Sequence, residues 1–133
     1  MRYLLDTNVC IEILRGRHAV LKARLDQIQF DDLALSSVVW AELHFGAQLA
    51  GNPAREAERV NHAFGKWLRL PFDDAPAEIY ARIRTQLHRS GSQIGANDLL
   101  IAATALAHDL ILVTHNTGEF SRVPGLQIED WQT

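Results

Sequence analysis

Short apolar runs, each followed by a segment of helical character, recur along the whole chain. The apolar runs predict five strands, at residues 3–5, 33–35, 70–72, 111–114 and 126–128. Apolar residues at helical spacing predict helices at residues 8–14, 18–28, 38–49, 54–68, 77–88 and 96–108. Strands that alternate with helices are typical of a parallel sheet flanked by helices on both faces. The pattern therefore predicts an α/β fold, and the length fits one domain over residues 1–133.

Two of the predicted helices have apolar patterns that suggest where they lie. Residues 96–108 are apolar around almost the whole helix, so we expect this helix to be central and buried. The helix at 54–68 has one apolar face, made of Val60, Phe64, Trp67 and Leu68. We expect this face to pack in the core, and a contact with a partner protein is the alternative.

Composition narrows the class of protein. Apolar residues make up 47% of the chain, which argues against disorder, and the net charge of -3 still permits a local basic groove. Lys22 and Lys66 are the only lysines, and the arginines suit bidentate contacts to phosphate. The single cysteine, Cys10, cannot form an internal disulfide, which fits a cytoplasmic protein. Asp6 interrupts the first apolar run, so we expect no signal peptide, and no apolar stretch is long enough to span a membrane.

Acidic side chains follow several of the predicted strands. Asp6 ends the first strand, Glu42 lies on the helix after the second, and Glu119 follows the fourth. Asp98 lies in the first turn of the buried helix that precedes the fourth strand. Ligands of an open parallel sheet bind beyond the carboxyl ends of its strands. The predicted fold therefore brings Asp6, Glu42, Asp98 and Glu119 to one edge of the sheet.

Each acid also has a simple structural alternative. Asp6 fits a helix N-cap, and Asp98 fits a first-turn acid that the helix dipole stabilises. Glu42 alone fits a solvated helix residue and Glu119 a surface loop. Convergence favours function, because clustered carboxylates raise one another's pKa and a hard divalent cation neutralises them. Oxygen ligands of this kind suit Mg²⁺ or Mn²⁺.

Four segments of the chain resemble the PIN-domain ribonucleases, in the same order. They are LLDTN at 4–8, SSVVWAEL at 36–43, IGANDLLIAATAL at 94–106 and LVTHNTGEFSRVPGLQIEDW at 112–131. Over essentially its full length the chain is most similar to the VapC toxins of bacterial toxin–antitoxin pairs. The resemblance implies a PIN-like α/β domain and a Mg²⁺- or Mn²⁺-dependent endoribonuclease.

The resemblance also implies roles for individual residues. Asp6, Glu42 and Asp98 match three acids of the family. Asn116 stands where many PIN domains carry Asp, so we expect Glu119, three residues on, to take the fourth position. This departure leaves one-metal and two-metal mechanisms open. The residues expected to orient ligands or water around the acids are Ser37, Thr114 and Asn116.

Partners follow from the same resemblance. It implies an RNA substrate, with initiator tRNA as the candidate, and a homodimer in a larger complex with a DNA-binding antitoxin of VapB type. An arginine of the antitoxin is expected on the acidic cluster, with its helix on apolar surface near residues 47–50. Phosphates are expected on two basic groups, whose alternative is a solvated surface: Arg82 with Arg89, and Arg15 with Arg17. The three tryptophans are expected mainly in the core or an interface, with base stacking as the alternative.

Two other functions remain open at this stage. A PIN-like module without activity could bind RNA or protein, and the Asn at position 116 keeps that alternative open. The intact acids Asp6, Glu42 and Asp98 argue against it. A nuclease that acts on DNA would use the same acids, and only the family resemblance favours RNA.

Overall fold

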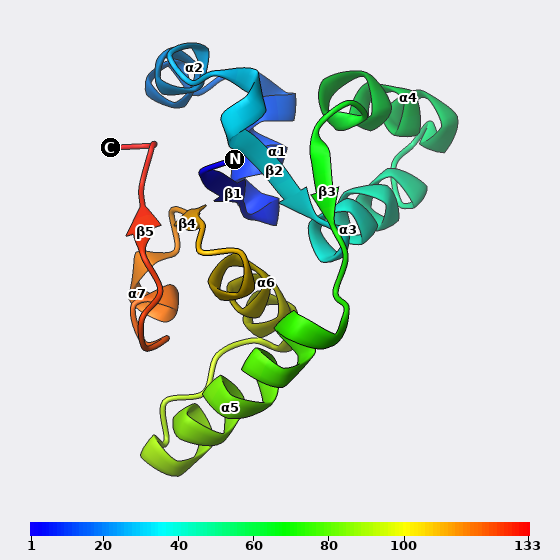
Figure 1. The fold of residues 1–133 in the computed structure, drawn as a ribbon. Helices are drawn as coiled ribbons and strands as arrows, with labels where there is room; N and C mark the ends of the chain where they lie inside the picture. Colours follow the sequence, from blue (N-terminus) through cyan, green and yellow to red (C-terminus); the bar gives the residue numbers. More distant parts are fainter.

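A parallel sheet of five strands forms the centre of the molecule, in the order β3-β2-β1-β4-β5 (Figure 1). The computed structural model describes residues 1–133. The strands are β1 (Tyr3–Leu5), β2 (Leu33–Ser36), β3 (Leu68–Leu70), β4 (Ile111–Val113) and β5 (Ile128–Glu129). The helices are α1 (Thr7–Arg15), α2 (Ala19–Asp26), the 3₁₀ turn η1 (Phe30–Asp32), α3 (Ser37–Gln48), α4 (Pro53–Phe64), α5 (Asp74–Ser90), α6 (Ala96–Ala107) and α7 (Thr117–Phe120). The expected α/β fold with an all-parallel sheet is confirmed.

The order of the strands places the helices in two layers. From β1 the chain moves outward to β2 and β3, and it then returns to the opposite side of β1 to form β4 and β5. Since crossovers between parallel strands are right-handed, this reversal moves the later helices to the other face of the sheet. Helix α3 accordingly packs on α1 and α4, while α5 packs along α6 (Figure 1). The strand order reverses at the β1–β4 pair, where a parallel sheet opens a crevice for ligands.

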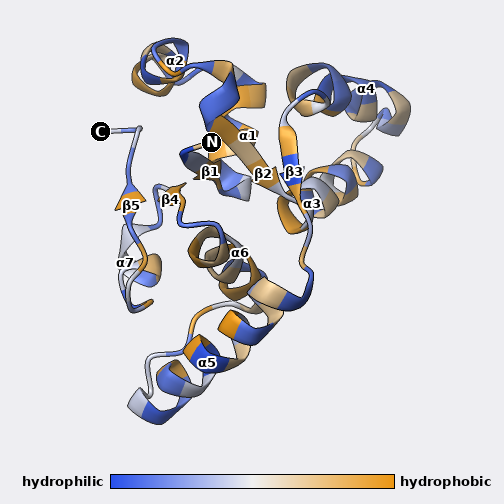
Figure 2. Ribbon diagram, in the orientation of Figure 1, coloured by the Kyte–Doolittle hydropathy of each residue, from blue (hydrophilic) through white to orange (hydrophobic).

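The core is built from the strands and the central helix α6. Ile101, Ala102, Ala103 and Ala105 of α6 are completely buried, as the apolar pattern of this helix predicts. Figure 2 shows the apolar residues concentrated on the strands and on α6, with hydrophilic residues on the outer turns of α4 and α5. None of the helices combines the length and apolar character that a membrane span needs.

The boundary between α4 and β3 differs from the expectation of a helix over 54–68. Helix α4 ends at Phe64, and β3 begins at Leu68, two residues before the expected strand at 70–72. Pro71 has no N–H, so the ladder with β2 stops at Leu70. Trp67 thus lies between the two elements, and Leu68 is exposed on the edge strand.

The remaining boundaries move by only a few residues. Helix α5 begins at Asp74 rather than at 77, because Pro76 is tolerated within the first turn of a helix. The last strand pairs at Ile128 and Glu129 rather than over 126–128, after a turn in which Gly125 has a φ of +79°. A glycine adopts this left-handed backbone without strain, so the turn delays the strand.

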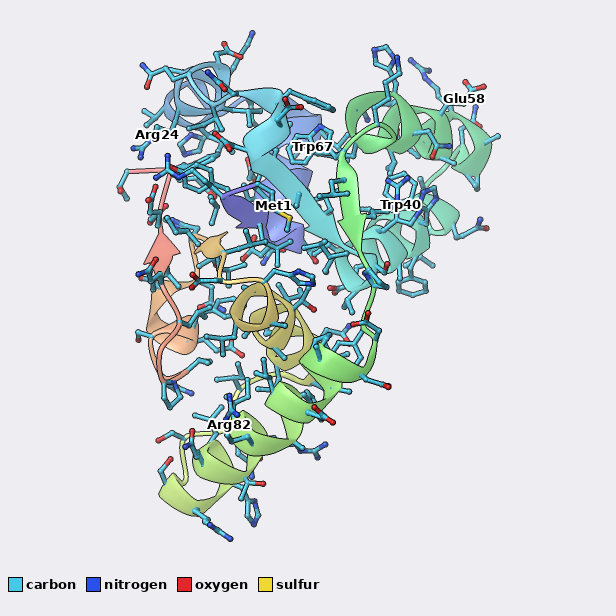
Figure 3. The ribbon with its side chains drawn as sticks, in the orientation of Figure 1. Met1, Arg24, Trp40, Glu58, Trp67 and Arg82 are labelled. Carbon is cyan, nitrogen blue, oxygen red and sulfur yellow. The ribbon has the colours of Figure 1, made fainter.

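Three of the four residues expected on the apolar face of the α4 segment pack in the core, and Leu68 does not. Val60, Phe64 and Trp67 are all buried, so they offer no surface to a partner. Trp131 is also buried, with its ring against Tyr3 at 5.0 Å between centroids. Trp40 is half-buried beneath the Arg69 guanidinium, and Figure 3 labels it on α3. The tryptophans therefore serve mainly as packing residues.

Candidate active site

Asp6 is a buried carboxylate at the junction of β1, β4 and α1. Its backbone N–H donates to the Val113 carbonyl of β4 at 3.0 Å, which fixes the residue at the point where the strand order reverses. Its Oδ1 accepts a hydrogen bond from the Val9 N–H at 2.9 Å, so Asp6 also caps α1. The side chain is only 4% exposed. Both sequence interpretations of Asp6, helix cap and member of the acidic cluster, therefore agree with the geometry.

Glu42 reaches the same edge from the second turn of α3. The Thr7 hydroxyl, at the start of α1, donates to Glu42 Oε1 at 2.8 Å. This bond crosses between two helices that pack together, and it fixes the direction of a half-buried carboxylate. Ser37 is exposed at the start of α3 and lines a surface hollow that also includes Glu42 and Asn97. Ser37 therefore lies near the site without contacting the carboxylates through a hydrogen bond.

Asp98 and Glu119 form a close pair of carboxyl groups, and the pKa of each depends on the other. The Gly95 N–H donates to Glu119 Oε1 at 2.6 Å, and the Asn116 side chain donates to Oε2, also at 2.6 Å. A β-carbon at position 95 would lie 3.5 Å from Glu119 Oε1 and 3.6 Å from Asp98 Oδ2. The absence of a side chain at Gly95 therefore leaves the space around both acids open.

The pKa values reflect this crowding. Burial raises the pKa of Asp6 and outweighs the opposing hydrogen bonds from Thr114 and the Val9 N–H, while the charge of Glu42 raises it further. Burial, the neighbouring Glu119 and the charges of Asp6 and Glu42 together raise the pKa of Asp98 to about 7.

The pKa of Glu119 shifts in the opposite direction, to a lower value. The Gly95 N–H lowers its pKa most, and Asn116, Asp98 and Arg122 lower it further against the effect of burial. Asp98 thus keeps its proton near neutral pH while its partner Glu119 stays ionised. Since the charges of Glu119, Asp6 and Glu42 all raise the pKa of Asp98, the four acids share one electrostatic site.

The polar residues after β4 support these acids. Thr114 is buried, accepts a hydrogen bond from the Asn116 N–H at 3.0 Å and stabilises the ionised form of Asp6. The side-chain amide of Asn116 donates to Glu119 and so holds that carboxylate in place. His115 turns toward Asp130, with 3.0 Å between Nδ1 and Oδ2. Thr114 and Asn116 are therefore placed where they can orient the acids.

The structure brings the four predicted acids together without a ready-made ion site. No three acidic, histidine or cysteine side chains are already arranged around a common point. The bonds of Thr7 to Glu42 and of Gly95 to Glu119 hold two of the carboxylates in their present directions. Ion binding would therefore require these side chains to turn inward.

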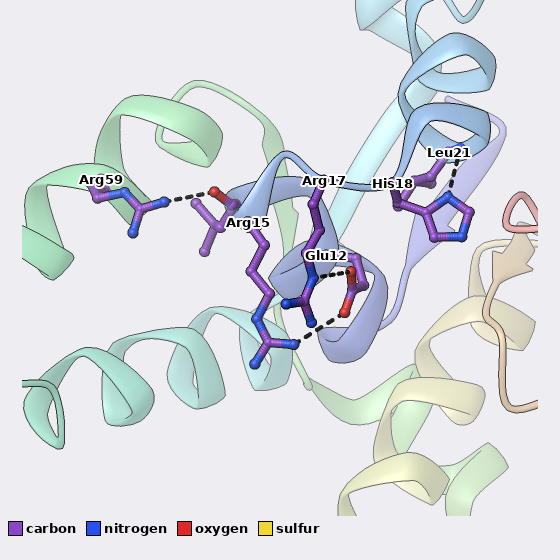
Figure 4. A network of polar contacts seen from close by, with 7 residues as sticks. Glu12, Arg15, Arg17, His18, Leu21 and Arg59 are labelled. Carbon is purple, nitrogen blue, oxygen red and sulfur yellow. Dashed lines mark hydrogen bonds and ion pairs between the residues drawn. The ribbon is translucent and has the colours of Figure 1, made fainter.

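The predicted basic groups lie in different places. Arg15 is the last residue of α1, about 13 Å along the helix from Asp6, and Arg17 lies two residues further on. Both pair with Glu12, at 3.1 and 3.7 Å (Figure 4). They are not brought to the acidic site. Arg82 and Arg89 are exposed on α5, which packs against the helix that carries Asp98.

The sequence analysis missed three residues that shape the site. Thr7 holds Glu42, Gly95 holds Glu119, and Arg122 lies beside Glu119 and donates to the Gln93 carbonyl at 3.1 Å. Thr7 follows Asp6 directly, Gly95 stands three residues before Asp98, and Arg122 stands three residues after Glu119. Their position beside the acids was the only signal available in the sequence.

Known proteins share the sequence pattern and the fold of this chain. The family model for the PIN domain matches residues 3–126. The chain belongs to the PIN-domain family. The tRNA(fMet)-specific endonuclease VapC of Shigella flexneri is 36% identical, and ribonuclease VapC2 of Haemophilus influenzae 33%, each over 131 residues and 98% of both chains.

Solved structures of VapBC complexes contain chains with the same fold as this PIN domain. The DNA-bound VapBC of Salmonella typhimurium superposes with a TM-score of 0.93 at 32% identity, over 98% of both chains. The VapBC-1 of nontypeable Haemophilus influenzae superposes with a TM-score of 0.91, also at 32% identity, over the whole of both chains.

The raised pKa of Asp98 predicts how stability depends on pH in the presence of a chelator. The unfolded chain releases this proton near pH 3.9, whereas the folded PIN domain holds it up to about pH 7. The folded state binds more protons between these values, so its stability falls as the pH rises through 7. We expect the melting temperature to fall by several degrees between about pH 5 and pH 8.

Thermal melts of Asp98→Asn across the same range provide the comparison, because asparagine cannot release a proton. The variant should melt with a flatter pH profile, while Glu58→Gln on the outer face of α4 should follow the wild type (Figure 3). Parallel profiles for the wild type and Asp98→Asn would contradict the assigned proton.

Proposed function

We propose that this PIN domain is a divalent-metal-dependent endoribonuclease and the toxin of a VapBC-type toxin–antitoxin pair. The observation that carries the proposal is the cluster of four carboxylates at the reversal of strand order, with the Asp98 pKa near 7. Relatives named as VapC ribonucleases, at 33–36% identity over 98% of the chain, support the same reaction.

The donor set suits a hard divalent cation, Mg²⁺ or Mn²⁺. Asp6, Asp98, Glu42 and Glu119 supply only carboxylate oxygens, the ligands that these ions prefer. Burial and the neighbouring carboxylates raise the pKa values of Asp6 and Asp98, and a bound cation would favour their ionised forms. Bound there, such an ion would supply Lewis-acid stabilisation of a phosphodiester and lower the pKa of a water molecule.

The acidic residues of the chain differ in their proposed chemical roles. Hydrogen bonds from Thr114 and the Val9 N–H favour the ionised form of Asp6, the form that would bind a cation at the base of the crevice. Asp98 titrates near neutral pH and can accept or give up a proton while Glu119 remains charged beside it. Hydrolysis by water at this site would leave a 5′-phosphate and a 3′-hydroxyl.

The substrate that we propose is RNA, and initiator tRNA is the specific candidate. Two relatives, from Shigella flexneri and Salmonella typhimurium, are named tRNA(fMet)-specific endonucleases. Arg82 and Arg89 make no ion pair within the chain and are exposed on α5, so they are free to contact phosphates.

The partner that we propose is an antitoxin that covers the acidic site. Phe45 and Leu49 of α3 are 64% and 72% exposed, and they line the same surface hollow as Glu42. A partner arginine paired with the carboxylates would place its apolar neighbours on these two side chains. The solved VapBC complexes that superpose on the chain support a partner of this kind.

Loss of an acidic residue should abolish cleavage without unfolding the protein. We expect Asp98→Ala or Glu42→Ala to reduce the rate of RNA cleavage in Mn²⁺ by about a hundredfold or more. Glu58→Ala, on the exposed face of α4, is the matched control and should cleave like the wild type. The measurement is the initial rate on purified tRNA, with the melting temperature recorded for each variant. An Asp98→Ala variant that folds and cleaves at the wild-type rate would exclude this site.

Metal and antitoxin should compete for the carboxylates. We expect antitoxin affinity, measured by calorimetry, to weaken as Mn²⁺ rises, and Asp98→Asn to lose part of this dependence. Leu49→Asp should weaken binding about tenfold or more at every Mn²⁺ concentration, because it places a charge in the apolar contact. Antitoxin affinity that responds to neither Mn²⁺ nor the substitutions would place the antitoxin elsewhere.

A further inference from the structure

A hollow opens between α5 and α6, beside the loop that joins the two helices. Its volume is about 210 Å³. Apolar side chains from both helices and the loop form its walls: Tyr80, Leu87, Ile94 and Leu99. Arg84 and Gln93 add polar groups to the lining. We call this hollow the α5–α6 slot.

The slot continues into a wider groove along the outer side of α5. The two hollows share Tyr80, Arg84 and Gln93, and the groove adds His88 and Arg89. The chain has no acidic residue from Ile79 to Asn97, although its net charge is -3. No arginine of α5 makes an ion pair, whereas Arg15, Arg17, Arg24 and Arg59 each pair with a glutamate. The groove is therefore a basic surface without internal neutralisation, which suits a phosphate backbone.

The polar groups of the slot match the recognition of a base. Arg84 Nη1 donates to the Tyr80 hydroxyl at 2.7 Å, and its guanidinium lies 5.7 Å from the centre of the tyrosine ring. The ring edge-packs on Phe72 at 5.9 Å, which holds it in place. Unstacked bases of RNA bind on aromatic rings and guanidinium planes, and their edges form hydrogen bonds with the protein. The Nε2 of Gln93 lies 2.9 Å from His88 Nδ1, which leaves its Oε1 to accept a hydrogen bond from a base edge.

The slot lies beside the acidic site. Gln93 and Ala96, which line it, flank the Gly95 N–H that binds Glu119. Arg122 ties the same loop to α7 through the Gln93 carbonyl. A strand whose phosphate meets the carboxylates can therefore place a neighbouring base on the other side of this short loop.

We propose that the α5–α6 slot binds one unstacked base of the RNA next to the cleaved phosphate and so sets the sequence preference of cleavage. Tyr80 stacks on the base, Arg84 covers it, and Gln93 reads its edge, while the arginines of α5 hold the adjoining phosphates. This inference rests on the proposed ribonuclease function and adds to it the residues that choose the sequence.

The test is cleavage of a random-sequence RNA pool in Mn²⁺, with sequencing of the new ends. Arg84→Gln removes the guanidinium from an exposed position, and Tyr80→Leu removes the ring but keeps apolar packing on Phe72. In both variants we expect the preference at one base beside the cut to fall about tenfold, the scale of losing one stacked base. KM for a preferred short RNA should rise while kcat is kept. Arg55→Gln, an exposed arginine of α4, is the control and should retain the wild-type preference.

The outcomes of this experiment distinguish failure of the slot proposal from failure of the proposed ribonuclease function. If both variants keep the wild-type sequence preference, the slot proposal is overturned and the ribonuclease proposal stays intact. Variants that keep the preference but lose binding of the antitoxin also overturn it, because the slot then binds protein. If the wild type cleaves no RNA, the proposed function fails, and photocrosslinking of 5-bromouridine RNA to the full chain decides the slot independently. A crosslink at the peptide with Tyr80 supports it, and crosslinks only elsewhere overturn it.

Discussion

The buried carboxylate of Asp6 joins the sheet, the first helix and the acidic site. Its N–H continues the pairing of β1 with β4, and its Oδ1 begins α1 by accepting the Val9 N–H. The fold thus places a carboxyl group at the reversal of strand order, where burial raises its pKa above the usual value. Asp98 reaches the same edge, and its burial, together with the charges of Glu119, Asp6 and Glu42, raises its pKa to about 7.

Hydrogen bonds from neighbouring residues keep this crowded site folded. Thr7 holds Glu42, and the Gly95 N–H and Asn116 hold Glu119, so each of these carboxylates has a neutral donor. Asp98 has no such donor and retains a proton instead. A cation would replace that proton, and the site therefore couples ion binding to proton release.

Much of the sheet and the acidic cluster could be predicted from the sequence, because both depend on short-range patterns. Buried parallel strands read as apolar runs, and the acids that follow them must meet at one edge. The α4–β3 boundary could not be predicted, because Trp67 and Leu68 continue the helical spacing of Val60 and Phe64. In the structure the helix nevertheless ends at Phe64, and pairing with β2 begins at Leu68. Thr7, Gly95 and Arg122 were missed because their roles depend on contacts between distant elements.

Binding of Mn²⁺ with simultaneous measurement of released protons tests the acidic site most directly. At about pH 6.5, below the Asp98 pKa of about 7, the account predicts that Mn²⁺ binding to the wild type releases a proton. Asp98→Asn should bind Mn²⁺ about tenfold or more weakly and release less. Glu58→Gln should match the wild type in both quantities. Failure of the wild type to bind Mn²⁺, or equal affinity and proton release in Asp98→Asn, would contradict the account.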